Sequence, residues 1–384
     1  MKILFLDQSG KPGGAELCLA DIAKPYRDSC LVGLFAEGPF RQLLEQQHIP
    51  VQVLTTQSIQ VRKESSLVQG LTSIGSLLPL INRVVQKARN YDLIYANTQK
   101  ALVVGALASF LSRRPLVYHL HDILSLDHFS RINRAIAVTL ANAQASLVIA
   151  NSYASQAAFV EAGGRAHLSE VVYNGFDPEL YQTDESTRNQ IRKELGLNEQ
   201  FIVGHFSRLS PWKGQHILIQ ALTQCPEDVT AIFVGEALFG EQDYAQSLQQ
   251  QIAELGLKER VRFLGFRSDI VPLMSACDLV AHTSVAPEPF GRVIVEAMLC
   301  GRPVVAAKAG GAVELVEHGC TGWLIPPEEP QLLADVIISC KNQPETTATI
   351  ARQAGDTASQ RFDLNTINQQ IEQLLRRSVT IQSD

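Results

Sequence analysis

Two acidic side chains are the first candidates for chemistry in this sequence. Glu288 and Glu296 stand eight positions apart, and the second lies within a helical pattern that ends at Gly301. Carboxylates that far apart along one helix do not share a proton, so each is suited to accepting hydrogen bonds from hydroxyl groups, worth roughly 1.5–3 kcal/mol apiece. A compound that carries hydroxyls on both sides of a diphosphate is a nucleotide sugar. The spacing alone fits equally well an ordinary strand–loop–helix unit with two solvated acids.

The start of the same helical pattern offers an anion site. Its first N–H groups belong to residues near Phe290, Gly291 and Arg292. These groups and the helix dipole, about half a positive charge, attract a phosphate without a metal ion. This stretch therefore predicts binding of a diphosphate next to the two carboxylates.

Two basic side chains could act on the same diphosphate. Arg208 and Lys213 lie five positions apart in a loop that leads from a strand pattern to a helix pattern. A guanidinium and an ammonium held at a helix start can neutralise a departing diphosphate. Basic residues in a loop are usually only solvated, so this prediction depends on the acidic stretch further along the chain.

The start of the chain has the order strand, glycine loop, helix. The apolar run 2–7 is followed by Gly13 and Gly14 and then by a helical pattern. This layout brings backbone N–H groups to a phosphate. The loop lacks the G-x-G-x-x-G spacing, which disfavours a dinucleotide, and a plain tight turn is the alternative.

A histidine ends another strand of the first half. The pattern 115–122, P-L-V-Y-H-L-H-D, contains His119 and, two positions later, His121. Ligands of parallel sheets sit beyond the carboxyl ends of the strands, which places His121 at the ligand-binding edge. His119 is predicted to lie in the sheet core. A purely structural hydrogen bond is the alternative role for His121.

Longer strings of the sequence resemble one family. P-E-P-F-G-R-x-x-x-E-A-M-x-x-G-x-P-V-V-A, followed by G-G and T-G-W-L, is similar to the donor-site signature of retaining glycosyltransferases of family 4, which use nucleotide sugars and have the GT-B fold. G-G-A-E, V-Y-H-L-H-D, N-G-F-D and R-L-S-P-W-K-G resemble its other motifs, although the first glycine of the family's G-R-L-x-x-x-K-G is replaced here. The resemblance covers nearly the whole chain and is sharper in the second half.

The resemblance implies roles for the candidate residues. Glu288 would hold hydroxyls of the donor sugar, Glu296 the ribose hydroxyls, and His121 would reach the donor sugar and the reacting centre. The strand 261–266 and the residues after it would seat the nucleotide base through backbone contacts. The implied catalytic residues are His121, Arg208, Lys213 and Glu288, and the implied donor-binding residues are Gly13, Gly14, Arg208, Lys213, Glu288, Phe290, Gly291, Arg292, Val293 and Glu296.

The alternation of strand and helix patterns predicts an α/β protein, and the resemblance implies its architecture. We expect the GT-B fold, with two Rossmann-like domains facing each other across a cleft. The expected domains are 1–173 on the acceptor side, 174–360 for the nucleotide sugar, and a helix in 361–384 that crosses back onto the first domain.

Composition sets limits on partners and compartment. The 384 residues are 46% hydrophobic, and a net charge of −6 argues against nucleic acid as a partner. Seven scattered cysteines without a C-x-x-C pair indicate reduced thiols. No signal peptide is visible and no apolar run approaches the roughly 20 residues that span a bilayer. These features predict a cytoplasmic protein.

The expected function is transfer of a hexose from a nucleoside diphosphate sugar, with UDP-glucose favoured, to an acceptor hydroxyl with retention of configuration. The sequence has no D-x-D site for a metal, so we expect catalysis that needs neither a metal ion nor another cofactor. An epimerase on the same scaffold and a non-catalytic nucleotide-sugar binding protein are the alternatives. A nicotinamide dehydrogenase is disfavoured because no dinucleotide fingerprint follows the first strand.

The acceptor is the least defined partner. A saccharide or a lipid-linked glycan of polysaccharide biosynthesis is expected from the family, and the loops 9–13, 57–66, 97–100 and 124–130 should select it. The amphipathic helix predicted within 66–89 carries basic residues near its end and should pack on the sheet. Its basic edge could also contact an anionic membrane as a peripheral protein does, which would suit a lipid-linked acceptor.

Overall fold

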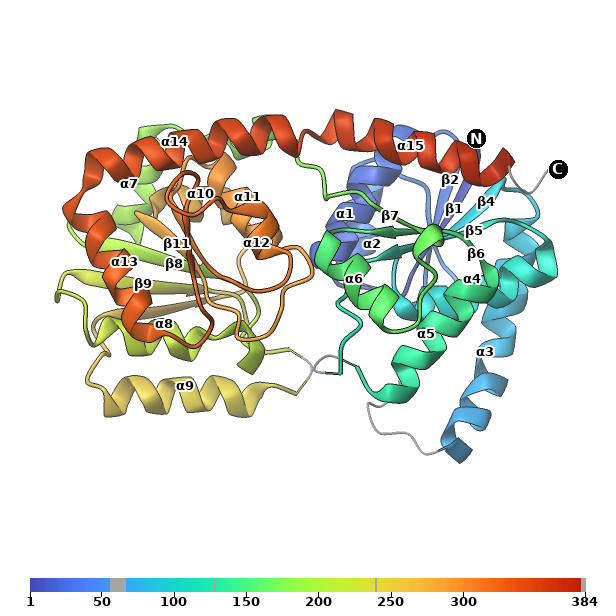
Figure 1. Ribbon diagram of the computed structural model, residues 1–384, viewed down its shortest axis with the longest axis horizontal. Helices are drawn as coiled ribbons and strands as arrows, with labels where there is room; N and C mark the ends of the chain where they lie inside the picture. The colour runs from blue at the N-terminus through green and yellow to red at the C-terminus, as the bar shows by residue number, and fades with distance from the viewer. Residues whose placement is uncertain (56–66, 127–128, 239, 381–384) are drawn as a thin grey trace. The chain divides into compact units, whose positions relative to one another are not determined.

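The computed structural model describes residues 1–55, 67–126, 129–238 and 240–380, with the side chains of 67–76 left out (Figure 1). The expected acceptor loop 57–66, and residues 127–128 of the loop 124–130, lie outside this part. The chain forms two compact units. The N-terminal unit is Met1–Gly175 with Leu364–Asp384, and the C-terminal unit is Phe176–Asp363.

The N-terminal unit is built on a parallel sheet of seven strands in the order β3-β2-β1-β4-β5-β6-β7. Most of these strands are continuous apolar runs, as expected where helices cover both faces of a parallel sheet. The strands are β1 Ile3–Asp7, β2 Cys30–Leu34, β3 Val51–Val53, β4 Leu93–Ala96, β5 Leu116–Leu120, β6 Ala145–Ala150 and β7 Ser169–Val171. The α-helices are α1 Gly14–Ala23, α2 Pro39–Gln46, α3 Leu67–Ala88, α4 Gln99–Ser112, α5 Arg131–Gln144, α6 Tyr153–Glu161 and α15 Leu364–Thr380.

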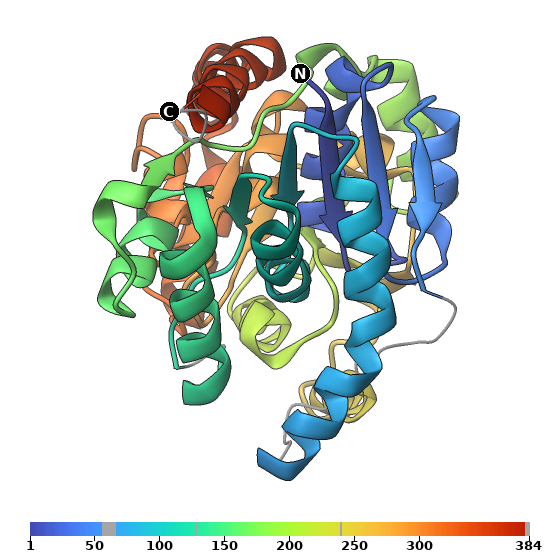
Figure 2. The same ribbon diagram turned by 90° about the vertical axis from the view of Figure 1, so that its right-hand side faces the viewer.

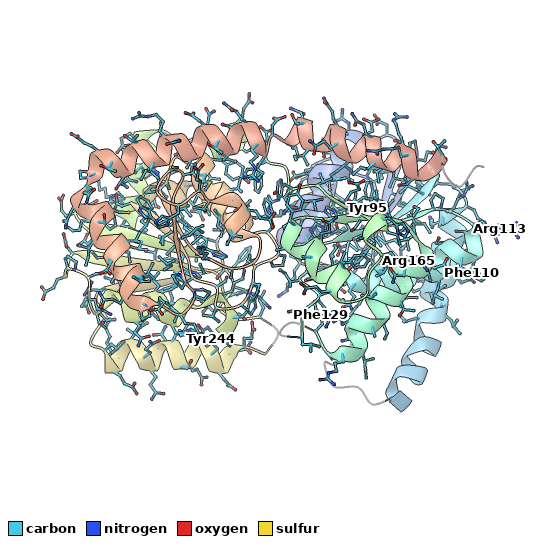
Figure 3. The ribbon with its side chains drawn as sticks, in the orientation of Figure 1. Tyr95, Phe110, Arg113, Phe129, Arg165 and Tyr244 are labelled. Carbon is cyan, nitrogen blue, oxygen red and sulfur yellow. The ribbon has the colours of Figure 1, made fainter. Side chains whose placement is uncertain are left out.

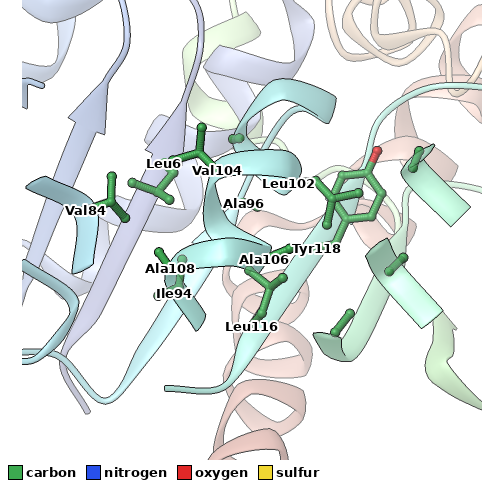
Figure 4. Close-up of a cluster of buried hydrophobic side chains, with 14 of the residues drawn as sticks. Leu6, Val84, Ile94, Ala96, Leu102, Val104, Ala106, Ala108, Leu116 and Tyr118 are labelled. Atoms are coloured by element: carbon green, nitrogen blue, oxygen red, sulfur yellow. The ribbon is translucent and has the colours of Figure 1, made fainter. Parts of the chain in front are cut away.

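Helices α3 and α4 cover one face of this sheet. Alternate residues of the strands, such as Leu6 and Ile94, meet Val84 of α3 and Val104 of α4 in one buried cluster (Figure 4). The apolar stripe of α3 thus packs on the sheet, as its periodicity predicts, except at Leu78, which was expected on the same face and is exposed.

The last helix, α15, belongs to the opposite face of the same sheet. Ile367, Ile371, Leu374 and Leu375 are buried in a cluster with strand residues such as Phe5. Figure 2 shows this C-terminal helix and α3 on different sides of the unit. The predicted return of the final helix to the first domain is confirmed.

The C-terminal unit repeats the plan with six parallel strands in the order β10-β9-β8-β11-β12-β13. The strands are β8 Phe201–Phe206, β9 Val229–Val234, β10 Val261–Gly265, β11 Leu279–His282, β12 Val304–Ala307 and β13 Trp323–Ile325. The α-helices are α7 Glu185–Glu194, α8 Gln215–Leu222, α9 Gln242–Glu254, α10 Ile270–Ala276, α11 Arg292–Leu299, α12 Ala312–Leu315, α13 Pro330–Asn342 and α14 Pro344–Arg361.

Both sheets have the first strand of their unit near the centre, with the next strands added on one side and later ones on the other. This is the Rossmann-like order, which leaves a ligand site at the carboxyl ends of the central strands. The predicted α/β class with two Rossmann-like domains is confirmed, whereas the cleft between the domains stays a prediction.

Candidate active site

The loop between β11 and α11 carries Glu288, and a glycine pair holds that loop in place. Glu288 and Gly310 form a parallel bridge, and the Gly311 N–H donates to the carbonyl oxygen of Glu288 at 2.7 Å. Gly310 has a φ of +60°, and a Cβ at this position would lie 2.3 Å from the Glu288 carbonyl oxygen. Only glycine combines this conformation with this approach. The G-G pair of the sequence therefore positions Glu288.

Three donors converge on one oxygen of the Glu288 carboxylate. Lys213 Nζ lies 2.7 Å from Oε2, Ser284 Oγ donates to it at 3.1 Å, and His282 Nε2 lies at 3.2 Å. Burial acts to raise the pKa of Glu288, but the charge of Lys213 and the hydrogen bond from His282 outweigh it and hold the pKa well below its usual value. Glu288 is thus ionised and can only accept hydrogen bonds.

Lys213 ends a short 3₁₀ turn, Pro211–Lys213, just before α8. The next residue, Gly214, has a φ of +69°, and a Cβ on it would lie 2.0 Å from the Thr283 carbonyl oxygen. This close approach brings the β8–α8 loop against the end of β11, where Glu288 follows. Lys213 Nζ also lies 4.0 Å from the centroid of the Trp212 ring. The ammonium is therefore fixed between a carboxylate and an aromatic face.

Arg208 follows β8 and lies in the same loop as Lys213. Its Cζ is 5.9 Å from the Trp212 ring centroid, and its Nη1 is 3.5 Å from Oε2 of Glu241. Ser210 Oγ donates to the other oxygen of Glu241 at 2.5 Å. The structure thus brings Arg208 and Lys213 to opposite ends of one short loop around Trp212, as the sequence predicts.

The start of α11 holds a second acid–base pair. Arg292 Nε lies 3.2 Å from Oε1 of Glu296, and the Arg292 guanidinium stacks 4.4 Å above the Phe176 ring. Phe290 is buried and also stacks on Phe176, so its side chain belongs to the core. Glu296 is therefore held by a cation one turn away rather than by Lys213.

A pocket of about 290 Å³ lies beyond the carboxyl ends of β8, β9 and β10. Phe263 and Gly265, from the strand expected to seat the nucleotide base, are among its lining residues. Most of its lining is apolar or backbone, which suits a flat ring held by main-chain groups. The remaining lining residues are Leu209, Gly235, Glu236, Ala237, Ala245, Gln246 and Gln249.

In the N-terminal unit, His121 follows β5 and its Nε2 lies 2.9 Å from Oδ1 of Asn97. The Asn97 amide nitrogen donates to Asp7 Oδ2 at 2.7 Å and to the Ala15 carbonyl oxygen at 3.1 Å. Because a carbonyl oxygen can only accept, the amide orientation is settled, and Oδ1 must accept from His121. The His121 ring is therefore protonated at Nε2, and in the neutral ring Nδ1 carries the lone pair.

The glycine loop before α1 lies next to a pair of buried acids. Gly13 precedes the first residue of α1, Gly14, and a Cβ on Gly13 would lie 2.8 Å from Oε2 of Glu16. Burial, followed by the charge of Asp7, raises the pKa of Glu16 to about 8, and burial raises the pKa of Asp7 to about 6. Near neutral pH the pair therefore retains a proton close to the loop.

The predicted residues fall into separate groups. Lys213 and Glu288 are brought together in the C-terminal unit, Arg208 lies at the other end of the loop of Lys213 with Glu241 as a partner, and Glu296 forms a separate pair with Arg292. The other donor-binding residues predicted in this unit lie at the start of α11, where Gly291 is buried and Val293 half-buried. His121, Gly13 and Gly14 belong to the N-terminal unit.

Several residues of the site were missed from the sequence. His282 and Ser284 hold Glu288, Asp7 accepts from the Asn97 amide that bonds His121, and Glu16 faces Gly13. Asn97 itself lies in the loop 97–100, which was expected to select the acceptor. A signal for Asp7 and His282 was present in the sequence, because both are polar residues at the carboxyl end of an apolar strand. The prediction that His119 lies in the sheet core is confirmed, since it is 1% exposed.

Two family models match the chain and together span most of it. The model described as "Glycosyltransferase Family 4" matches residues 12–180, and the model described as "Glycosyl transferases group 1" matches residues 187–357. The first match falls almost wholly in the N-terminal unit and the second in the C-terminal unit. The order of the two models along the chain follows the two sheets.

Relatives agree with these models. The chain is 30% identical over 247 residues to spore coat protein SA of Bacillus subtilis. The match covers 61% of this chain and 65% of that protein, so the chain spans slightly less than two thirds of the relative's length. It is 27% identical over 316 residues to a D-inositol 3-phosphate glycosyltransferase of Corynebacterium efficiens, over 77% of this chain and 73% of the relative.

Solved structures share the fold. A crystal structure of Anabaena HepE in complex with UDP-glucose is 66% identical with a TM-score of 0.92, covering 98% of this chain and 100% of that one. A glycosyltransferase from Rickettsia africae, at 20% identity and a TM-score of 0.81, shares the fold over 98% of both chains. The predicted GT-B fold and the predicted family are confirmed, and the chain belongs to the group 1, family 4 glycosyltransferases.

Proposed function

We propose that this glycosyltransferase moves glucose from UDP-glucose to an acceptor hydroxyl and retains the anomeric configuration. The observation that carries the proposal is the buried pair of Glu288 and Lys213, with Nζ and Oε2 2.7 Å apart. It provides one acceptor for sugar hydroxyls and one cation for a phosphate in the same place. HepE, which is 66–67% identical to this chain, has been crystallised with UDP-glucose and also with UDP and glucose.

Each residue of the C-terminal group has a proposed role. Ionised Glu288 accepts hydrogen bonds from hydroxyls of the donor sugar and positions it, without acting as a covalent nucleophile. Lys213 and Arg208 stabilise the charge that develops on the departing diphosphate, an effect typically worth roughly 10²–10³-fold in rate. The leaving phosphate takes the proton of the acceptor on the face from which it departs, which retains the configuration.

Backbone groups, a pocket and the side chain of Glu296 are proposed to hold the rest of the donor. We assign the diphosphate to the N–H groups at the start of α11, including those of Gly291 and Val293. The Gly13–Gly14 turn of the N-terminal unit is a second proposed phosphate-binding element. The uracil base is assigned to the pocket at Phe263 and Gly265. Glu296 binds the ribose hydroxyls while it keeps its ion pair with Arg292, whose guanidinium cannot itself accept a hydrogen bond.

His121 is proposed to contact the donor sugar through Nδ1. Because Asn97 accepts from Nε2–H, the neutral ring presents its lone pair at Nδ1, which accepts a hydrogen bond from a hydroxyl. A neutral imidazole that faced the sugar with N–H instead would have to accept from Asn97, whose amide oxygen cannot donate. The tautomer is therefore suited to binding a hydroxyl group.

The reaction is proposed to need neither a metal ion nor another cofactor, because Arg208, Lys213 and helix N-termini supply the positive charge. We also propose that the expected domains 1–173, 174–360 and 361–384 correspond to the two units and to the returning helix. The acceptor is assigned to the class of saccharides and lipid-linked glycans of polysaccharide biosynthesis.

Contact with a membrane surface is proposed for the end of α4. Phe110 and Leu111 are 69% and 58% exposed, and Arg113 and Arg114 follow them. Figure 3 labels Phe110 and Arg113 at this end of the helix. Exposed apolar and basic residues side by side suit the interface of an anionic bilayer. The basic edge predicted on α3 is partly used within the unit, since Arg83 donates to the Leu54 carbonyl oxygen at 2.7 Å. In the described part of the chain, no helix has the length and apolar character needed to cross a bilayer.

One assay tests the donor, the metal independence and the alternatives. The protein is incubated in EDTA with UDP-glucose, UDP-galactose or GDP-mannose, with and without saccharide acceptors, and nucleoside diphosphate release is followed. Release of UDP from UDP-glucose supports the proposal. An epimerase would convert the sugar without releasing UDP, and a binding protein would show calorimetric binding with neither outcome.

Cosedimentation with phosphatidylglycerol vesicles, compared with phosphatidylcholine vesicles, tests the membrane contact. The double variant Phe110→Ser with Arg113→Glu should lose binding to the anionic vesicles. Leu180→Ser, which changes an equally exposed residue of the C-terminal unit, is the control and should still bind. Equal binding of both variants to the anionic vesicles would contradict a membrane contact at the end of α4.

A further inference from the structure

A cluster of soft metal ligands lies in the N-terminal unit. Cys18 of α1, His119 of β5 and His121 each offer one ligand atom, and these atoms lie within 4.8 Å of one another. The two imidazole rings have centroids 3.8 Å apart. One thiol with two imidazoles is a set that zinc binds well.

His119 supplies an independent indication of a ligand. It is 1% exposed, yet its Nε2 has no hydrogen-bond partner in the described part of the structure. Its Nδ1 lies 2.6 Å from the hydroxyl of Tyr95. A buried polar atom without a partner is costly, and a bound metal ion would satisfy the lone pair of this nitrogen.

Both histidines have the outer hydrogen bonds that are typical of metal-ligating histidines. Such a residue uses one ring nitrogen for the metal and bonds the other to a second group that fixes the ring. Tyr95 is that group for His119, and Asn97 is that group for His121.

The thiol of Cys18 is the third ligand. Its Sγ donates to Oδ1 of Asn174 at 3.4 Å, so it is a protonated thiol when no metal is bound. Zinc with bonds of about 2.0–2.3 Å sets its ligands roughly 3.5 Å apart, which requires the three side chains to close by about 1 Å. The thiol releases its proton to solvent as the S–Zn bond forms.

We propose that Cys18, His119 and His121 form a zinc site that inhibits the enzyme. Zinc takes Nδ1 of His121, the atom that we assign to a hydroxyl of the donor sugar, so a bound ion removes that contact. The metal plays no part in the reaction itself. The inhibitory half of this inference depends on the proposed role of His121, whereas binding of zinc does not.

Cobalt(II) is the probe for the site, because its visible bands report the coordination geometry and a near-ultraviolet band reports a bond to sulfur. The full-length protein is titrated with cobalt(II), and zinc is then added to displace it. Wild type should show the sulfur-to-cobalt band, and Cys18→Ser should lose it together with at least about tenfold in zinc affinity. Cys320→Ser, which changes a less buried cysteine of the other unit, should behave as wild type.

Activity is read separately in the same proteins. Zinc should inhibit the transfer of glucose by wild type and Cys320→Ser, and should not inhibit Cys18→Ser, which keeps its metal-free rate. If the serine destabilises this buried position, Cys18→Ala gives the same comparison. The site is refuted by the absence of the sulfur band in wild type or by its survival in Cys18→Ser. Sulfur-bound cobalt without zinc inhibition would refute only the inhibitory role. If the protein does not use UDP-glucose, the cobalt titration still shows whether the metal site exists.

Discussion

Lys213 Nζ and Glu288 Oε2 lie 2.7 Å apart, with only 15% and 11% of their side chains exposed. An ion pair this far from solvent is weak evidence of stability, because the loss of solvation offsets much of the attraction. Removing one partner alone is costly, by about 3–5 kcal/mol, since the other charge is left buried. The pair is therefore better explained by a ligand that uses both charges than by folding.

We predict that Lys213→Ala and Glu288→Ala each lower the turnover of UDP-glucose roughly 10²–10³-fold. Circular dichroism at low temperature should show that both variants still fold. A turnover equal to that of wild type in either variant would contradict the proposed role of that residue. The double variant Lys213→Met with Glu288→Gln should unfold at a higher temperature than Lys213→Ala, because it leaves no buried charge unpaired.

The acid limb of the stability curve should depend on Glu288. Its pKa lies below the ordinary value of 4.5, so the group stabilises the fold above that pH and the contribution is lost as the pH falls below it. Urea unfolding of wild type and Glu288→Gln should therefore give a difference at pH 7 that shrinks below about pH 4. A difference that stays constant across this range would contradict the depressed pKa.

Glu16 should have the opposite effect. Its pKa is raised from 4.5 to about 8, so the folded chain binds more protons than the unfolded one between these values, and stability falls as the pH rises through them. Glu16→Gln should remove that fall and stabilise the protein more at pH 8 than at pH 5. The exposed Glu199→Gln is the control, and a slope unchanged by Glu16→Gln would disprove the shift.

Gly310→Ala should disturb catalysis through the backbone of Glu288. The new Cβ would lie 2.3 Å from the Glu288 carbonyl oxygen, so the loop must move. Gly301→Ala is a matched control, because Gly301 has a similar φ of +66° and a Cβ added to it would meet no atom within 4 Å. Both should lose roughly 1–2 kcal/mol from left-handed strain, but only Gly310→Ala should lose most of its turnover. Equal turnover in the two would show that Gly310 does not position Glu288.

Asn97→Ala should remove the hydrogen bond that fixes the proton of His121 on Nε2. Nitrogen-15 NMR of labelled histidine should find His121 protonated at Nε2 in wild type and divided between the two ring nitrogens in the variant. We expect a decrease in turnover that is larger than any loss of thermal stability. Asn142→Ala, which removes an exposed side-chain hydrogen bond to Gly163, should leave the His121 signals unchanged. His121 signals that are identical in wild type and Asn97→Ala would contradict the argument.

Local patterns predicted most of the fold. The strand before Asp7, the helix that ends near Gly301 and the apolar face of the last helix were all readable from periodicity. A role for Glu288 was predicted because its neighbours form a dense motif, and that role stays a prediction. The ion pair of Arg292 and Glu296 also follows from i,i+4 spacing on a helix. Both residues were expected only to bind the donor, and the pair was not predicted.

Contacts between distant residues were not readable in the same way. Lys213 and Glu288 are 75 positions apart, and Asp7 and Asn97 are 90 apart. Each contact depends on the order of strands within a sheet, which one sequence does not specify. The burial that raises the pKa of Glu16 likewise comes from tertiary packing.

The most direct test of the account is the product that the purified protein forms from UDP-glucose in EDTA, measured by proton NMR with a panel of saccharide acceptors. We predict UDP release with an α-linked glucoside as the product, and loss of both in Glu288→Ala and Lys213→Ala. No binding of UDP-glucose by calorimetry and no UDP release with any acceptor would contradict the central claim. A β-linked product would contradict retention.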